Sequence, residues 1–170
     1  LGDSNIAVGH EALTDNTIGQ KNTAIGFRAL YTEDVGNESV AVGFKALYLQ
    51  NSDSDNEITA NTAVGFSSGY FNVTGQNNTY LGYKAGFGAS GNSNSYNTAV
   101  GTNALLSVTT GDQNSVLGQN AGDALTTGGL NVIIGQSAGS TSTDVDRAIV
   151  IGVDAANSNM TSAADGTIAI

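Results

Sequence analysis

The stretch NTAIGFRALY, residues 22–31, returns almost unchanged as SVAVGFKALY at residues 39–48. Each copy contains a word of the form (Asn/Ser)-x-(Ala/Val)-(Val/Ile/Leu)-Gly, and close variants of this word recur along the chain of 170 residues. The glycines that end the words recur about every 17 residues, apart from one insertion of five and one of two, and a fixed period of this kind identifies a repeat protein. The repeat glycines are Gly9, Gly26, Gly43, Gly65, Gly82, Gly101, Gly118, Gly135 and Gly152.

The residues before each repeat glycine predict a β-strand. Counting from this glycine as position 0, position −1 is always aliphatic, position −3 is nearly always β-branched, and position −2 is mostly alanine. Because side chains alternate along a strand, positions −3 and −1 share one face and position −2 lies on the other. A period of this length suits one coil of a parallel β-solenoid, with two short strands and two turns. We therefore expect an all-β parallel β-roll of about ten coils.

Two columns after the repeat glycine predict the turns of the coil. Position +3 is alanine in nearly every coil, which indicates a tight bend where neighbouring layers of backbone approach closely. A second glycine recurs at position +10, where we expect a return corner that requires φ above zero. These corner glycines are Gly19, Gly36, Gly75, Gly111 and Gly128.

The repeat extends over the whole chain, so residues 1–170 are expected to form a single array with insertions near 48–60 and 88–96. Gly2 and Ile170 occupy repeat positions of coils that are cut at the two ends, and we expect a segment of a longer fibre. A coil this short is too thin to bury both apolar faces of its strand within itself. One face therefore requires a neighbouring chain.

The composition excludes several classes of function. Five Lys and Arg against fifteen Asp and Glu give a net charge of −10, which repels the phosphate backbone of nucleic acids. No apolar run approaches the roughly 20 residues of a membrane helix, so we expect no direct insertion of this segment into a membrane. With one His and no Cys, no pattern of nucleophile and base emerges, and we expect neither an enzyme nor a required cofactor.

The repeated word resembles the head repeats of trimeric autotransporter adhesins, the Hep/Hag-type words (N/S)-(T/S/V)-(A/V)-(I/V)-G-x-x-A. Similar words occur in bacteriophage tail fibres and in related bacterial fibre-like adhesins. The resemblance covers nine full words and part of a tenth, although the return loops are longer than is typical of the adhesin heads. It implies a left-handed parallel β-roll that associates as a homotrimer.

The function implied by this resemblance is attachment to a cell or host surface through a glycan or protein receptor. The location would be the cell surface, the extracellular space or a virion tail fibre. The first alternative is a segment of a bacteriophage tail fibre or tailspike. The second is a solenoid that binds ice or a mineral through flat ranks of threonine such as Thr62, Thr79 and Thr98.

Eight of the eleven aromatic residues lie in two columns, at positions +1 and +5 of coils two to five. One interpretation is a strip that stacks sugar rings or other flat ligands; the other is that the rings fill gaps between coils or chains. The candidate ligand-binding residues are Phe27, Tyr31, Phe44, Tyr48, Phe66, Tyr70, Tyr83 and Phe87.

The five-residue insertion carries the sequence NSDSDNE at residues 51–57. In an extended loop Asp53, Asp55 and Glu57 would point the same way, and carboxylate oxygens are the ligands that Ca²⁺ prefers. The loop lacks the glycine and the distant glutamate of an EF-hand. A Ca²⁺ site and a solvated acidic loop both remain open.

Overall fold

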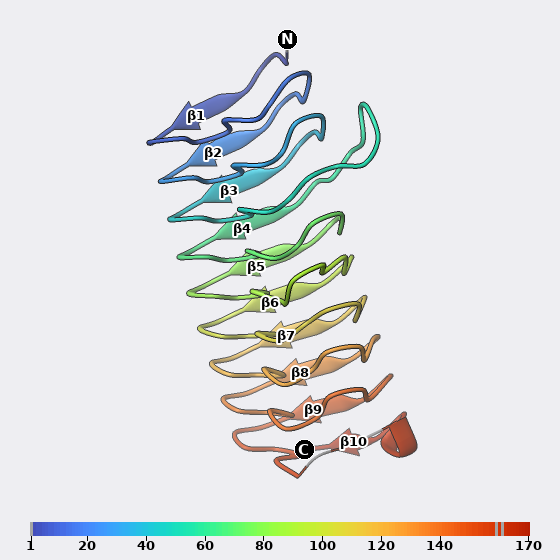
Figure 1. Ribbon diagram of the computed structural model, residues 1–170. Coiled ribbons are helices and arrows are strands. Elements are labelled where there is room, and N and C mark those ends of the chain that lie inside the picture. The colour runs from blue at the N-terminus through green and yellow to red at the C-terminus, as the bar shows by residue number, and fades with distance from the viewer. Residues whose placement is uncertain (1, 159, 161) are drawn as a thin grey trace.

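The fold is a parallel β-solenoid in which each coil adds one strand to a single sheet (Figure 1). The structure, a computed structural model, describes residues 2–158, 160 and 162–170. The ten strands pair in sequence order, each parallel to the one before it. They are β1 (Ile6–Val8), β2 (Thr23–Ile25), β3 (Val40–Val42), β4 (Thr62–Val64), β5 (Thr79–Leu81), β6 (Thr98–Val100), β7 (Ser115–Leu117), β8 (Val132–Ile134), β9 (Ile149–Ile151) and β10 (Ile168–Ala169), with a short 3₁₀ helix, η1 (Ser162–Ala164), before β10.

The register of the sheet confirms the repeat, because equivalent residues of successive repeated words lie opposite each other in neighbouring strands. Thr62 of β4 lies opposite Thr79 of β5, and Val64 lies opposite Leu81. The expected second strand in each coil was wrong. In the described residues the rest of a coil is turn and bend, joined to its neighbours by isolated bridges and single hydrogen bonds between equivalent positions.

The two glycine columns have different physical causes. At Gly65 φ is +142°, and a Cβ there would lie 2.2 Å from the carbonyl oxygen of Gly82 in the next coil. The corner glycines at position +10 do not take the positive φ that the sequence predicted. Gly75 is required instead by close approach, since a Cβ there would lie 1.9 Å from the carbonyl oxygen of Asn94. The positive φ falls two residues later, at non-glycine positions such as Asn77.

The core is a narrow column inside the coils, filled from positions −2, +3 and +4. Where position −2 is alanine, position +4 is often leucine, as in Ala24 with Leu30. Where position −2 is larger, position +4 is small, as in Val116 with Gly122. The combined volume of the two side chains is therefore similar in these pairs, and the interior of the coil stays closely packed.

Tyr80 is the largest fully buried side chain and occupies a position −2 that is usually alanine. A Cβ at Gly86 would lie 2.2 Å from its ring, and one at Gly69 would lie 2.9 Å from it. These two glycines therefore make room for the ring from its own coil and from the coil before. The hydroxyl of Tyr80 donates a hydrogen bond to Asn94, and burial raises the pKa of the phenol far above its usual range.

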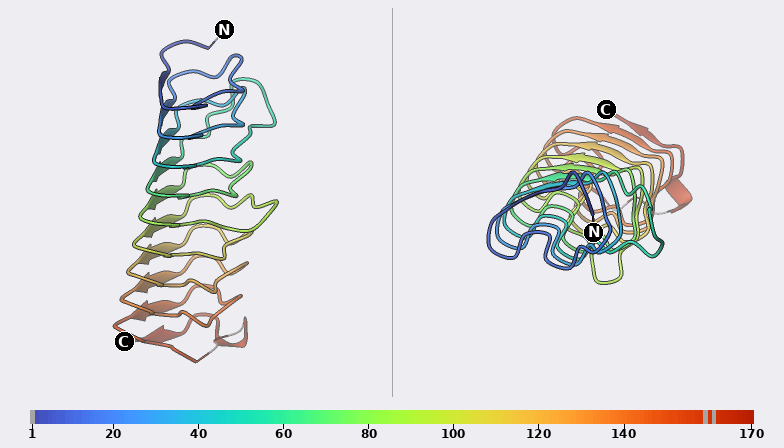
Figure 2. Two further views of the ribbon diagram at one scale, coloured as in Figure 1. Left: turned by 60° about the vertical axis from the view of Figure 1, so that its left-hand side comes forward. Right: turned by 90° about the horizontal axis from the view of Figure 1, so that it is seen from above.

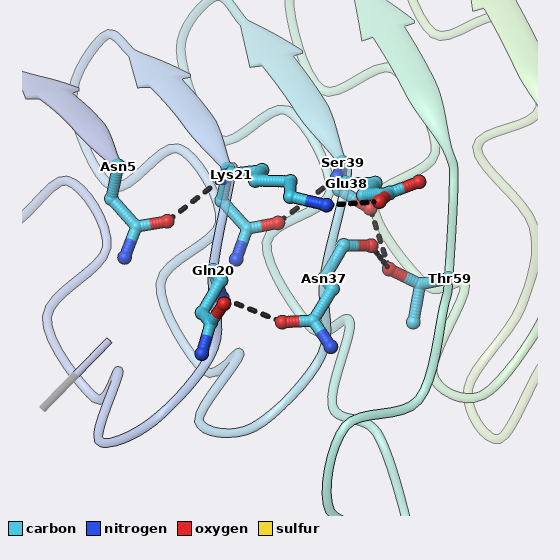
Figure 3. Close-up of polar contacts among 8 residues, drawn as sticks. Asn5, Gln20, Lys21, Asn37, Glu38, Ser39 and Thr59 are labelled. Atoms are coloured by element: carbon cyan, nitrogen blue, oxygen red, sulfur yellow. Dashed lines mark hydrogen bonds and ion pairs between the residues drawn. The ribbon is translucent and has the colours of Figure 1, made fainter. Parts of the chain in front are cut away.

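A ladder of asparagines at position −4, buried from Asn22 onward, closes the corner before most strands, whereas Ser39 precedes β3 and Ala148 precedes β9. The Oδ1 of Asn22 accepts a hydrogen bond from the backbone N–H of Ser39 at 2.9 Å, and its Nδ2 donates to the carbonyl of Gly36 at 2.7 Å. Figure 3 shows the start of the ladder at Asn5. The side chains thus satisfy buried backbone groups that the short strands leave unpaired. The ladder continues through Asn61, Asn78, Asn97, Asn114 and Asn131.

Candidate functional site

The two aromatic columns form ladders on the outer surface of the solenoid, at the corner that follows the strand. The rings at position +1 are exposed, from 37% for Phe27 to 47% for Tyr83. The rings at position +5 are half-buried. None of the eight belongs to the buried core. We call these two ladders, with the position +2 residues between them, the aromatic strip.

Neighbouring rings of each ladder stack on one another along the fibre. In the first ladder Phe66 stacks on Phe44 with ring centroids 4.9 Å apart and planes 6° apart. In the second, Tyr70 stacks on Tyr48 at 5.0 Å and 25°. The faces of successive rings therefore cover one another, and the ring edges are left to contact solvent or a ligand.

The backbone of this corner explains why the rings align. Positions +2 and +4 take a left-handed conformation in successive coils, with φ of 52° at Arg28 and 50° at Leu30. The N–H of Arg28 donates to the carbonyl of His10 at 2.9 Å, and the N–H of Lys45 donates to the carbonyl of Phe27 at 2.8 Å. Because each corner is bonded to the same corner of the next coil, identical side chains repeat at the spacing of the strands.

Three basic residues lie between the two ladders at position +2. The Arg28 guanidinium carbon lies 5.2 Å from the ring centroids of both Phe27 and Tyr31. The Lys45 Nζ lies 4.9 Å from the ring centroid of Tyr48. The Lys84 Nζ lies 5.1 Å from the ring centroid of Phe87 and 5.5 Å from that of Tyr83. These contacts fall within the range in which a cation is attracted to an aromatic ring.

The three cations differ in their ion pairs. Arg28 pairs with the Glu11 carboxylate of the preceding coil, and this hydrogen bond lowers the pKa of Glu11. Lys45 and Lys84 have no carboxylate within 4.0 Å among the described residues. The aromatic strip therefore presents two uncompensated positive charges on a chain of net charge −10. Partial burial raises the pKa of the neighbouring Tyr70 phenol.

The sequence predicted the ladders but not this arrangement. Stacking of a sugar on exposed ring faces requires free faces, and the faces between neighbouring rings of a ladder are occupied by one another. The basic residues at position +2 were missed. Their shared position in coils two, three and five was a signal in the sequence that could have revealed them.

The outer face of the sheet is a second candidate surface. Strands β2 to β9 alternate as predicted, with position −2 buried and positions −3 and −1 turned outward, whereas Ala7 of β1 is exposed. Leu81 is 48% exposed and Leu117 is 50% exposed, whereas Tyr80 and Val116 between them are buried. We call the columns at positions −3 and −1 the apolar face. It is uncovered in the single chain.

The acidic insertion extends from the solenoid between β3 and β4 (Figure 1). Asp53 and Asp55 are exposed, and Asp53 accepts a hydrogen bond from Ser54 at 3.2 Å. Glu57 instead accepts a hydrogen bond from Gln76 in the following coil. Within the described residues, no group of three or more His, Asp or Glu side chains is placed to hold a metal ion. The three carboxylates are thus not brought together as a Ca²⁺ site requires.

A small polar pocket lies beside this insertion, with a volume of about 170 Å³. The Lys21 Nζ and the Glu38 carboxylate form an ion pair of 2.9 Å at its wall (Figure 3). Because its cation is already neutralised, the pocket offers hydrogen bonding by amide groups rather than charge. Its lining residues are Gln20, Lys21, Asn37, Glu38, Asn56 and Ile58.

Both insertions extend from the side of the coil away from the strands, as the two views of Figure 2 show. The apolar face is therefore unobstructed along its length. In the described part of the chain, no helix is long and apolar enough to cross a membrane. Comparisons with protein-family models, curated protein sequences and solved structures found no match to this chain.

Proposed function

We propose that this chain is a structural and adhesive fibre segment that associates as a homotrimer and attaches to a glycan or protein receptor on a cell or host surface. The observation that carries the proposal is the apolar face. A bacteriophage tail fibre would use the same association, and the proposal covers both settings, at a cell surface or on a virion.

The apolar face has the composition of a buried surface. Neither of its two columns contains Lys, Arg, Asp or Glu, although the chain has 20 such residues. Among the described residues, the exposed large apolar side chains lie on this face or in the bordering column at position +1, except for Ile58, Tyr96 and Leu130. Contiguous exposed apolar surface on this scale marks an interaction site.

The size of the face fits association with copies of the same chain. Ten strands extend roughly 45 Å along the fibre, and the apolar face together with the bordering column at position +1 extends about 16 Å across it. The product is close to the roughly 800 Å² per partner that a stable interface buries. A face that is equally long in every copy can be covered completely by another copy in parallel register.

The number of chains and the attachment function come from the resemblance to trimeric adhesin heads. Three chains would triple the number of any weak site on the surface. Multivalent engagement of this kind raises avidity by roughly 10²- to 10⁴-fold without new contacts. An adhesive fibre built from regular coils therefore needs only modest affinity at each site.

Oligomeric mass measured by light scattering tests the proposal. The parent chain should have the mass of three chains. Val64→Asp places a charge on the apolar face and should give a folded chain of lower mass, because Val64 points outward and its coil packs without it. Asn77→Asp adds the same charge outside the face and should leave the mass unchanged. A folded, monomeric parent would falsify the proposal.

An ice-binding surface is a second candidate, favoured by one observation. Thr62, Thr79 and Thr98 are paired in register on the outer face of the sheet. The rank ends after three coils, where Val40 and Ser115 replace threonine. Thermal hysteresis in a monomeric parent would support this candidate, and a trimer without hysteresis would exclude it.

A further inference from the structure

The basic residues of the aromatic strip lie at position +2, next to the surface that the proposed trimer buries and outside it. Three of the five Lys and Arg in the chain lie at position +2 of coils two, three and five. Arg28 is neutralised by Glu11, whereas Lys45 and Lys84 keep their charges. On so acidic a chain, a local pair of free cations favours an anionic ligand.

The rings around these lysines favour the same ligand. Lys45 lies within 6 Å of three ring centroids, those of Phe44, Tyr48 and Tyr70. The attraction between each ammonium group and the neighbouring rings holds the lysine side chains beside the ladders. The rings therefore fix the positive charges in place for an anionic ligand.

The spacing of the lysines defines the pattern of charge that fits. Ser67 occupies position +2 of the coil between them and is 4% exposed, so the row of cations has a gap of one coil. Lys45 and Lys84 are consequently two coils apart, which is roughly 10 Å at the strand spacing of a sheet. One coil advances along the fibre by nearly the length that one sugar adds to an extended glycan.

We propose that the aromatic strip binds an acidic glycan, extended along the fibre, that carries a carboxylate on every second sugar. One carboxylate pairs with Lys45 and the next acidic sugar places its carboxylate at Lys84. The intervening neutral sugar lies over Ser67, between the edges of Phe66 and Tyr70. This assignment rests on the proposed adhesive function and names the ligand of one of its surfaces.

Binding of hyaluronan oligosaccharides tests the assignment, because they carry a carboxylate on alternate sugars. The parent should bind them, and the same oligosaccharides with their carboxyl groups reduced should bind roughly tenfold more weakly or not at all. Binding should also weaken as salt is raised. Equal binding of the reduced oligosaccharides, or no binding by the parent, would overturn the assignment.

Variants distinguish specific binding by the two lysines from a general effect of the net charge of the chain. Lys45→Gln and Lys84→Gln should each weaken hyaluronan binding roughly tenfold, the effect of losing one charge-assisted contact. Arg147→Gln removes the same charge from an exposed position outside the strip and should leave binding unchanged. An equal loss in all three variants would show attraction by net charge alone and would overturn the assignment.

A charge-neutral rearrangement tests the spacing. The double variant Lys45→Gln with Ser67→Lys moves the cations to adjacent coils, and position +2 accepts lysine in the coils on either side with the same φ. Hyaluronan binding should fall as far as in Lys45→Gln alone. Retained binding would contradict the two-coil register. Light scattering on each variant shows whether the oligomeric mass is unchanged, so that a loss of hyaluronan binding can be distinguished from a loss of the proposed trimer.

Discussion

Coils two to five and coils six to nine share the same strand and outer corner, apart from the two insertions in the first group, but carry different side chains at equivalent positions. Position +1 is aromatic in the first group, and it is Thr102, Gln119, Gln136 and Val153 in the second. Position +7, which points inward, is Glu33, Gln50 and Asn72 in three coils of the first group, and Val108 and Leu125 in two of the second. The repeated word thus determines the coil, and the remaining columns distinguish the interior and the surface of the two halves of the solenoid.

The polar column at position +7 of the first group makes hydrogen bonds, beside the apolar core of the same coils. Glu33 is fully buried, and its carboxylate accepts hydrogen bonds from the N–H of Gly36 at 2.7 Å, from the N–H of Ser52 at 3.2 Å and from Gln50 Nε2 at 2.7 Å. A buried carboxylate without such partners would be costly. The equivalent Val108 is surrounded by apolar neighbours of the core.

The largest expected effect comes from exchanging these two interiors. Val108→Glu buries a carboxylate with no donors prepared for it and should destabilise the fold by several kcal/mol. Glu33→Val removes the shared acceptor of three buried donors and should cost roughly 2–4 kcal/mol. Urea unfolding at a fixed protein concentration measures both. Thr110→Glu, at an exposed site in the same coil, is the control and should change stability little.

If Val108→Glu is tolerated as well as Thr110→Glu, the interiors of the two halves are interchangeable. The difference between polar and apolar residues at position +7 would then make no contribution to the free energy of unfolding.

A smaller effect is expected from the outer corner. Phe66→Ala removes a ring stacked between Phe44 and Tyr83 and should cost roughly 1–3 kcal/mol, less than a core aromatic because the ring is 44% exposed. Gln119→Ala, at the same position in coil seven, should stay within about 0.5 kcal/mol. Equal changes in unfolding free energy for the two variants would show that the ladder contributes nothing to stability.

The smallest expected effect concerns Asp123, which occupies position +5 where coils two to five have Tyr or Phe. Burial raises the pKa of its carboxyl group, and its Oδ1 has no hydrogen-bond partner in the described structure. A pKa raised by folding means that the folded state binds the proton more tightly, so this residue destabilises the fold at neutral pH and the penalty is relieved as pH falls through the raised pKa. Asp123→Asn should therefore melt slightly higher than the parent at neutral pH.

The difference between the two melting temperatures should shrink on acidification. A difference that is constant with pH, or that grows as pH falls, would rule out the carboxylate as its cause.

Much of the fold could be predicted because a solenoid repeats the same physical constraints in every coil. The alternation around Ala24 placed one face inward, and the repeat glycines set the register. The replacement of the expected second strand by a turn could not be predicted from periodicity, because a left-handed turn with φ near +50° at Arg28 and Leu30 uses ordinary residues that give no local signal. The corner glycines were assigned the wrong cause, since close approach between coils depends on the layer above rather than on local sequence.

The candidate site could be predicted only in part. The columns of the rings were visible in the sequence, but whether their faces would be free depends on how far the coils advance along the fibre. Glu57 shows the same limit: its spacing from Asp53 suggested a shared ligand, and a hydrogen bond from Gln76 in the next coil places it elsewhere. In both cases a contact between coils decides the outcome.

The stacking of one short strand per coil also has a mechanical consequence. The hydrogen bonds between coils run along the fibre axis, so a pull on the two ends of the fibre loads them directly. One coil contributes about 4.8 Å to the folded length. The same coil extends to roughly 55–60 Å once its residues are released. Peeling a single coil therefore lengthens the chain about twelvefold at that point, and we expect a stretched solenoid to yield coil by coil and absorb a sudden load.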